Sequence, residues 1–522
     1  MKHLNVRKTT GKARTSLLFI LFVLVTPVLP AQLPRVKITL EIRNKPVSDI
    51  LDDISGQTGY YFTYDSGLFP SKNRLSYAVQ DLYLASALDS LFHDSTLTYR
   101  LIDKNIVIYR KNRVRQPAAS PDSAVYRRIK GVIVDDRSGK PLPFASIALY
   151  GTNKGTITNE SGEFALNIPP GINDALLTVS YIGYHNQYKA VPANRGTDIT
   201  IRLAKDVISL QEVIIRYQDP ADLLDEAIAK IPDNYLNQNS LMTAYYRENV
   251  QRNKKVLLFS EAVLDILKYS YNGSTPDEKV KIIKGRKFMD VTDEDTVLMK
   301  IKSGIRSSFD LDIVKSLPYF LTADNHHLFD YEFSDIVSYK NQMVYVVNFH
   351  QKPQIKEALF TGDIYLDMDN LTILAADFQL DPRYIGQETS TFVIRKSPRL
   401  KIKPLSAIYH VEYRKSAGGY HLGQVRGEVR FKMRKRKKWI ASLYSLKIEM
   451  AVTDVEPGFS EKFRNNETIN TGVILSDQDF TPDAAFWGDY NTIEPEASLT
   501  DVLKKMGKQQ TWNEDFGSAP DK

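Results

Sequence analysis

The sequence predicts a mainly β protein of the α+β class, on three observations. Near the N-terminus, an apolar pattern with helical spacing occurs twice between strand-like runs. Residues 131–184 alternate short apolar runs with turn glycines, which is typical of a small antiparallel β-sandwich. Between residues 343 and 452, apolar and polar side chains alternate along strand-like segments. We therefore expect a duplicated βαβ domain, a β-sandwich and a C-terminal antiparallel sheet with helices.

Residues 1–31 have the features of a secretory signal peptide. Basic residues precede the apolar run Leu17–Val25, and the small residue Ala31 precedes the expected cleavage point. The run is shorter than the roughly 20 residues that a membrane-spanning helix needs. The 522 residues include no cysteine, so the chain forms neither a disulfide nor a lipid-modified N-terminal cysteine. We expect an exported protein of the periplasm or of the periplasmic face of the outer membrane, with no transmembrane span after cleavage.

Residues 32–111 contain an internal duplication. The first helix has one apolar face with i, i+3, i+4 and i+7 spacing, formed by Val47, Ile50, Leu51 and Ile54. The same spacing returns at residues 84–91, again between strand-like runs, so we expect two βαβ units packed on each other. The pieces QTGYYFTY and SALDSL resemble the short N-terminal domain of secretins and TonB-dependent receptors. The resemblance implies a docking module for periplasmic signalling proteins, and the alternative is a duplicated scaffold that retains no partner.

Residues 112–125 are predicted to be a linker, since Pro and Ser without periodicity cannot bury a core. The motifs GVIVDD, SGKPLP, YGTNKGTIT, SGEF and SYIGY follow and place a sandwich at residues 126–216. They closely resemble the carboxypeptidase-regulatory-like, transthyretin-type domain of Gram-negative envelope proteins. The chain departs from that pattern at Thr158-Asn159-Glu160, where Thr-Asp is usual. The resemblance implies a non-catalytic accessory domain without metal ligands or a nucleophile.

Residues 217–498 are predicted to form a β-rich C-terminal domain. Asp219 is expected to cap a helix that begins at Pro220. Alternating faces follow, formed first by Met343, Tyr345, Val347 and Phe349 and later by Tyr444, Leu446, Ile448, Met450 and Val452. We expect this sheet to curve over a helix and to enclose an apolar groove.

Three pieces of this domain, AYYRE, FSEAVL and FWGDYN, carry a further resemblance. They resemble a family of uncharacterised envelope proteins in which a carboxypeptidase-regulatory-like domain precedes a β-rich region. The C-terminal residues 499–522 are expected to form a tail, a short helix followed by disordered chain.

No sequence motif for catalysis, a cofactor or a metal is present. None of the eight histidines lies in an HExxH or HxxE zinc signature, and neither a GxSxG elbow nor a phosphate-binding glycine loop occurs. Without cysteine, thiol catalysis is excluded. We therefore predict a protein that is not an enzyme and has no catalytic residue, cofactor or metal.

The strongest polar cluster in the sequence is Tyr246-Arg247-Glu248. On a strand, Tyr246 and Glu248 share one face and Arg247 points to the other. The favoured interpretation is an ion pair beside a half-buried aromatic ring. The functional alternative makes these three residues candidate ligand contacts in the C-terminal groove.

The most basic run, Lys432–Trp439, lies between two strand-like segments. It is predicted to be a solvated hairpin tip, and the alternative is contact with an anionic lipid or lipopolysaccharide. The formal net charge of +7 belongs partly to the signal peptide and does not indicate a nucleic-acid partner.

Together these features predict an exported cell-envelope protein that acts as a non-enzymatic binding or scaffolding module. The expected partner is an envelope protein, with an anionic lipid or a glycan as a further candidate. The alternative function is a lipid or glycan carrier or sensor that uses the groove of the C-terminal sheet. A more distant alternative is an enzyme of unrecognised type, because a fold does not exclude one.

Overall fold

The computed structural model describes residues 36–64, 74–91, 97–102, 105–110, 126–172, 175–191, 198–206, 219–273, 277–289, 299–301, 304–340, 342–388, 393–396, 400–416, 418–435, 439–472, 475, 478, 480, 487, 489–496 and 499–503. The predicted signal peptide, the predicted linker and the predicted disordered end of the tail lie outside these residues. The chain divides into two compact units, Met1–Ala119 and Ser120–Lys522, and each is described by itself.

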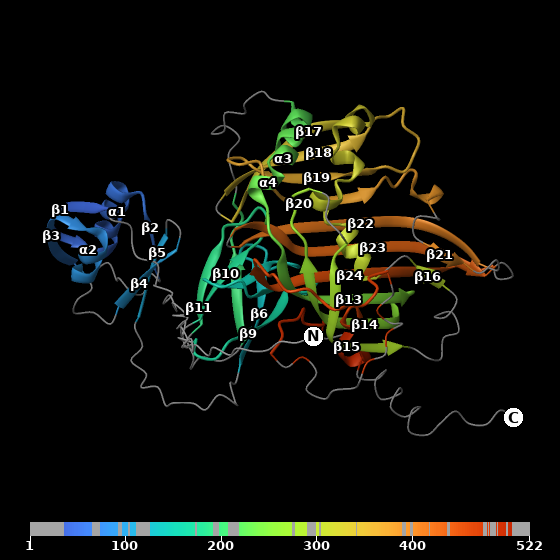
Figure 1. The fold of residues 1–522 in the computed structure, drawn as a ribbon, viewed down its shortest axis with the longest axis horizontal. Coiled ribbons are helices and arrows are strands. Elements are labelled where there is room, and N and C mark those ends of the chain that lie inside the picture. Colours follow the sequence, from blue (N-terminus) through green and yellow to red (C-terminus); the bar gives the residue numbers. More distant parts are fainter. Residues whose placement is uncertain are drawn as a thin grey trace, which may run out of the picture. The chain divides into compact units, whose positions relative to one another are not determined.

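The first unit has two small sheets and two helices (Figure 1). Its elements are β1 (Lys37–Pro46), α1 (Val47–Thr58), β2 (Tyr61–Tyr64), β3 (Arg74–Tyr83), α2 (Leu84–Leu91), β4 (Leu97–Ile102) and β5 (Asn105–Arg110). The apolar face of α1 is buried, and α1 ends at Gly59, whose φ of 69° suits glycine.

The strand pairing in this unit differs from the predicted βαβ pairs. β1 pairs with β3 in antiparallel orientation, and β2 pairs with β5, which also pairs with β4. The two strands around each helix therefore belong to different sheets. β1 runs into α1 without an intervening loop, so α1 links the two sheets instead of crossing back over one of them.

The second unit begins with a sandwich of two sheets. The strands are β6 (Arg127–Asp135), β7 (Ser146–Leu149), β8 (Gly155–Ile157), β9 (Glu163–Ile168), β10 (Ala175–Ser180), β11 (Gln187–Val191) and β12 (Asp198–Leu203). Their order is β11-β10-β7-β8 in one sheet and β12-β6-β9 in the other, and apolar side chains from both sheets form one core. Gly131 in β6 allows β12 to approach, because a Cβ there would lie 2.4 Å from the Ile199 carbonyl oxygen.

A ten-stranded sheet dominates the rest of this unit, with the order β15-β14-β13-β24-β23-β22-β20-β19-β18-β17. All neighbouring strands are antiparallel. The strands are β13 (Ser240–Arg252), β14 (Lys255–Lys268), β15 (Lys279–Met289), β17 (Phe329–Tyr339), β18 (Gln342–Gln351), β19 (Phe360–Asp367), β20 (Ile373–Leu380), β22 (Leu400–Ser416), β23 (Gly419–Lys435) and β24 (Ser442–Pro457). β16 (Met299–Ile301) and β21 (Val393–Lys396) form a separate pair.

Short helices cover one face of the large sheet. They are α3 (Pro220–Ala229), α4 (Ile231–Asn234), α5 (Ile305–Asp310), α6 (Ile313–Ser316) and the 3-10 helices Tyr319–Leu321 and Ala323–Leu328. The predicted cap is confirmed, since an Asp219 carboxylate oxygen accepts a hydrogen bond from the Ala221 amide. Side chains of these helices join the sheet in one apolar core. Over the described residues this face is therefore packed, where the alternation predicts an apolar groove.

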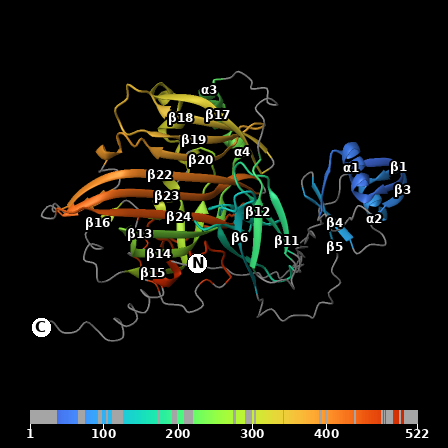
Figure 2. The ribbon, with the colours of Figure 1, turned by 180° about the vertical axis from the view of Figure 1, so that it is seen from behind.

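Three neighbouring strands are the longest of the sheet, with 17, 17 and 16 residues against 14 in β14. At one end of the sheet, β22, β23 and β24 extend beyond the neighbouring strands, as both views show (Figures 1 and 2). A second apolar core, which includes Phe431, Met433 and Tyr444, supports this extension.

Candidate functional site

A row of polar and charged residues crosses all ten strands of the large sheet. In strand order the row consists of Arg286, Glu261, Arg247, Glu449, Arg426, His410, Asp377, Asp363, Asn348 and Glu332. Each residue is directly opposite the next in the strand register, so all lie on one face of the sheet. The first five alternate in sign, which makes every neighbouring pair attractive. We call this set the charge row.

Arg247 is the most enclosed basic residue of the charge row, with a side chain that is 4% exposed. It donates hydrogen bonds from Nη2 to the Ile493 carbonyl oxygen over 2.6 Å and from Nε to the Tyr245 hydroxyl over 3.1 Å. Its guanidinium also lies 3.4 Å from Glu449 Oε2 and 3.7 Å from Glu261 Oε2. Burial alone would lower the pKa of Arg247, but Tyr245, Glu449 and Glu261 outweigh it and raise that pKa. The bonding capacity of Arg247 is thus taken up within the chain.

Tyr246 and Glu248 lie on the opposite face of β13. Both are buried, and the Tyr246 hydroxyl donates to Glu248 Oε1 over 2.7 Å. Burial and the adjacent Glu248 raise the pKa of Tyr246 well above its usual value. The structure therefore separates the three candidate ligand contacts onto two faces and buries each of them. Their contact with a ligand stays a prediction.

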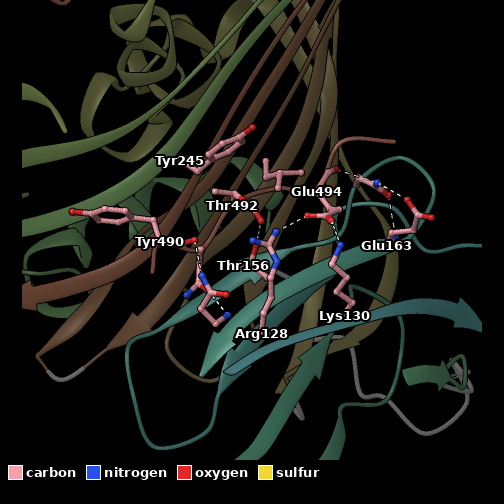
Figure 3. A network of polar contacts seen from close by, with 12 residues as sticks. Arg128, Lys130, Thr156, Glu163, Tyr245, Tyr490, Thr492 and Glu494 are labelled. Carbon is pink, nitrogen blue, oxygen red and sulfur yellow. Dashed lines mark hydrogen bonds and ion pairs between the residues drawn. The ribbon is translucent and has the colours of Figure 1, made fainter. Parts of the chain in front are cut away.

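A C-terminal segment, residues 489–496, lies between the sandwich and the large sheet (Figure 3). Thr492 forms a bridge with Ala165 of β9, and its carbonyl oxygen accepts a hydrogen bond from Thr156. Glu494 makes ion pairs with Arg128 over 2.7 Å and with Lys130 over 2.6 Å. Burial alone would raise the pKa of Glu494, but these two basic residues outweigh it and lower that pKa.

The same segment reaches the large sheet on its other side. Ile493 packs with Tyr245 and Ala451, and its carbonyl oxygen accepts the Arg247 hydrogen bond. The sandwich also contacts the sheet directly, since the Arg426 guanidinium lies 3.5 Å from the centre of the Phe144 ring. Lys154 and Asp454 form a further ion pair across this boundary. The sandwich and the large sheet are therefore joined by buried polar and apolar contacts.

A cavity of about 560 Å³ opens among α3, α4, α5 and α6. Its apolar lining includes Ile228, Ile231, Phe309 and Val314. Its charged lining consists of Asp277, Glu278, Arg306, Asp310 and Lys315. A volume of this size falls in the range of small-molecule pockets.

A buried ion cluster lies behind this cavity. Lys268 Nζ lies 2.7 Å from Asp312 Oδ2 and 2.9 Å from Glu278 Oε1, while Lys315 Nζ lies 2.6 Å from the same Glu278 oxygen. The Tyr413 hydroxyl donates to Asp312 over 2.8 Å. Burial alone would raise the pKa of Glu278, but Lys268 and Lys315 outweigh it and lower that pKa to about 2. The cluster keeps Glu278 ionised at the cavity wall.

Sequence reasoning missed this cluster. Lys268, Glu278 and Asp312 come from three segments with no shared motif. One usable signal is that Lys268 directly follows the apolar residues Ile266 and Leu267 in a strand, where a buried lysine needs a partner. Among the described residues, no group of three or more His, Cys, Asp or Glu side chains is placed to hold a metal ion.

Residues 129–215 match the family model described as a CarboxypepD_reg-like domain, so the sandwich is a domain of this kind. The TonB-dependent receptor P39 of Formosa agariphila is 30% identical over 87 residues, which are 17% of this chain and 8% of that protein. The TonB-dependent receptor SusC of Bacteroides thetaiotaomicron is 36% identical over 87 residues, with the same shares. The chain thus spans about 8% of the length of these curated relatives.

Solved structures give only weak similarity. A DUF1329 family protein from Desulfovibrio piger has a TM-score of 0.20 at 15% identity and covers 45% of this chain and 94% of its own. Lipovitellin has a TM-score of 0.23 at 7% identity, and the match covers 48% of this chain and 28% of the lipovitellin chain. At these scores the similarities support no argument about fold or function. No helix among the described residues is long and apolar enough to span a membrane.

Proposed function

We propose that this protein is a non-enzymatic binding or scaffolding module of the cell envelope. The CarboxypepD_reg-like domain at residues 129–215 supports this proposal, since the family is regulatory and not catalytic. The similarity of the domain to part of two TonB-dependent receptors supports an outer-membrane association. The features of residues 1–31 support export to the periplasmic side.

One observation carries the scaffolding role. The segment 489–496 pairs with the sandwich through Thr492 and with the large sheet through Ile493. Buried hydrogen bonds from Thr156 to Thr492 and from Arg247 to Ile493, with partly exposed ion pairs at Glu494 and Lys154, support one fixed geometry of the two folds. Surfaces on the sandwich and on the sheet then keep a fixed spacing, which is what a scaffold needs.

Site-specific crosslinking of the full chain in a Gram-negative host tests this role. A photoreactive residue replaces Lys140, which is exposed on the sandwich, or Lys356, which is exposed on the large sheet. We expect discrete crosslinks to envelope proteins from at least one of the two positions, in the envelope fraction. A matched Glu494→Ala background loosens the sandwich and should weaken those crosslinks. Crosslinks to cytoplasmic proteins only, or none from either position, would contradict the proposal.

The cavity among α3–α6 supports a second candidate function, which is the binding of a glycan. Its lining mixes Phe309 and Ile228 with Glu278, Arg306 and Lys315. Sugar hydroxyls form hydrogen bonds with such groups, whereas an acyl chain would leave them without partners. Calorimetric titration with soluble envelope oligosaccharides should give saturable binding that Phe309→Ala weakens. Lys356→Ala, at an exposed position on another loop, is the control. Displacement of an apolar dye by fatty acid, with no response to sugars, would instead support a lipid ligand.

A further inference from the structure

Basic residues from the β13–β14 turn, β22 and β23 lie together at the extended end of the large sheet. Arg252 at the β13–β14 turn is opposite Tyr444 of β24, Tyr444 is opposite Phe431 of β23, and Phe431 is opposite Pro404 of β22. The stretches 252–255, 400–406, 430–435 and 439–444 therefore meet at this end. They contain nine Lys or Arg residues and no Asp or Glu, and of these nine Arg430 forms an ion pair with Glu428 at the inner border of the stretch. We call these four stretches the basic end.

Like charges are directly opposite each other at the basic end. Lys403 is opposite Lys432, and Lys401 is opposite Arg434. Such pairs destabilise a sheet unless an anion lies between them. The four residues share one face, because each pair is in register and members of one strand are two residues apart. The strand pairing thus holds several positive charges close together on one surface.

Large apolar side chains project from the same end. Trp439 is 95% exposed and Ile440 is 84% exposed, the highest values among large apolar side chains in the described part of the chain. Leu443, which follows, is half exposed and is opposite Lys432. Covering an exposed apolar side chain lowers the free energy by roughly 25 cal/mol for each Å² of apolar surface removed from water.

We infer that the basic end binds the surface of a bilayer that contains anionic lipids. Trp439 would enter the headgroup region, where indole rings concentrate, and Ile440 would reach the acyl boundary beside it. The lysines would contact headgroup phosphates, and each contributes about 1 kcal/mol near an anionic surface. Weak apolar insertion and charge attraction together give stable attachment where either alone does not. This inference does not depend on the proposed scaffolding role.

The combination favours a membrane over a soluble polyanion. A nucleic acid would use the basic face and aromatic stacking but leave Ile440 and Leu443 in water. A membrane covers both the charges and the aliphatic side chains. The basic end is also the terminal edge of β22–β24, which extend beyond the other strands of the sheet (Figures 1 and 2). A flat surface can therefore reach it.

Vesicle flotation with the full mature chain tests the inference. We expect binding to vesicles of phosphatidylcholine with phosphatidylglycerol, and much weaker binding to phosphatidylcholine alone. Trp439→Ala/Ile440→Ala and Lys401→Glu/Lys403→Glu should each reduce binding at least about tenfold. Binding by the wild type should fall more steeply with salt than binding by the Lys401→Glu/Lys403→Glu variant. Lys140→Glu/Lys356→Glu makes the same change of charge at exposed positions elsewhere and should bind like the wild type.

Three outcomes would overturn the inference. The first is equal binding to neutral and anionic vesicles, and the second is undiminished binding by the Trp439→Ala/Ile440→Ala variant. The third is displacement from vesicles by soluble oligonucleotide with no blue shift of tryptophan emission on vesicles, which would identify a polyanion partner. Thermal unfolding of each variant shows whether the fold is kept, and the blue shift should disappear in Trp439→Phe.

Discussion

The first five residues of the charge row and the basic end lie on the same large sheet but arrange charge in opposite ways. In the charge row, Arg247 is directly opposite Glu261 and Glu449, and the chain itself covers these groups. At the basic end, Lys403 is opposite Lys432, and exposed apolar side chains lie beside them. Alternating signs under a cover stabilise the fold, whereas repeated signs at an open end do not. The difference separates charges that pair across strands and support the fold from charges of one sign that are concentrated at one end of the sheet.

Arg247→Ala should give the largest loss of stability. The change removes the cation that buried Glu449 and Glu261 share and leaves them only Arg426 and Arg286, while burial already raises the pKa of Glu449. Breaking a buried ion pair by removing one partner costs about 3–5 kcal/mol. Urea unfolding of the full chain measures this loss of unfolding free energy. Lys230→Ala, which breaks an exposed helical pair with Glu226, is the control and should cost about 0.5 kcal/mol or less. A loss as small as in the control would show that the charge row does not hold the sheet and sandwich together.

The cavity cluster should behave like the charge row in its pH dependence. The pKa of Glu278 is lowered from 4.5 to about 2, so its contribution to stability is complete above pH 4.5 and is lost as the pH falls towards 2. The contribution is on the order of 2–3 kcal/mol for a nearly buried carboxylate with such a shift. The difference in unfolding free energy between the wild type and Glu278→Gln should therefore shrink between pH 5 and pH 2. A difference that stays constant over that window would mean that Lys268 and Lys315 do not stabilise the ionised form.

Glu494→Ala should have a smaller effect, because its partners are partly exposed. Arg128 and Lys130 keep contact with water while they pair with Glu494. Loss of a partly screened ion pair costs about 1 kcal/mol. The change should also expose β9 to amide exchange at Ala165, where the C-terminal segment pairs. Unchanged exchange would indicate that Thr492 and Asn491, whose Oδ1 accepts a hydrogen bond from the Asn167 amide, hold the segment without Glu494.

The sequence pattern predicts much of this fold, because strand and helix periods are local. Tyr444, Leu446 and Ile448 alternate in the sequence and are all buried. The alternation also places Arg247 on the face opposite Tyr246, as the structure has it. The pattern fails at one end of β18, where Met343 is 37% exposed and Val344 is buried in its place. Alternation does not show where neighbouring elements cover both faces of a strand.

The candidate sites are less predictable, since they depend on long-range register. The charge row joins residues from Arg247 to Glu449 that no local motif connects. The cavity exists because α3–α6 pack on the sheet, and no single segment encodes that packing. The basic run around Lys432 is visible in the sequence, but only the strand register places it opposite Lys403 and beside the β13–β14 turn.

Lys432→Glu should have the smallest effect on stability, with the opposite sign to the others. The new carboxylate would be directly opposite Lys403 and two residues from Arg434, so a repulsive position becomes attractive. Opposite charges across a strand pair contribute roughly 0.2–1 kcal/mol, and salt screens them. Urea unfolding at low salt should therefore show a small gain in unfolding free energy that disappears at high salt.

The same variant should bind anionic vesicles more weakly than the wild type. A gain in unfolding free energy together with weaker binding is expected where the residues of a surface contribute to binding a partner and do not stabilise the fold. A loss of stability in Lys432→Glu would mean instead that Lys432 already has an anionic partner within the chain, and that the basic end resembles the charge row after all.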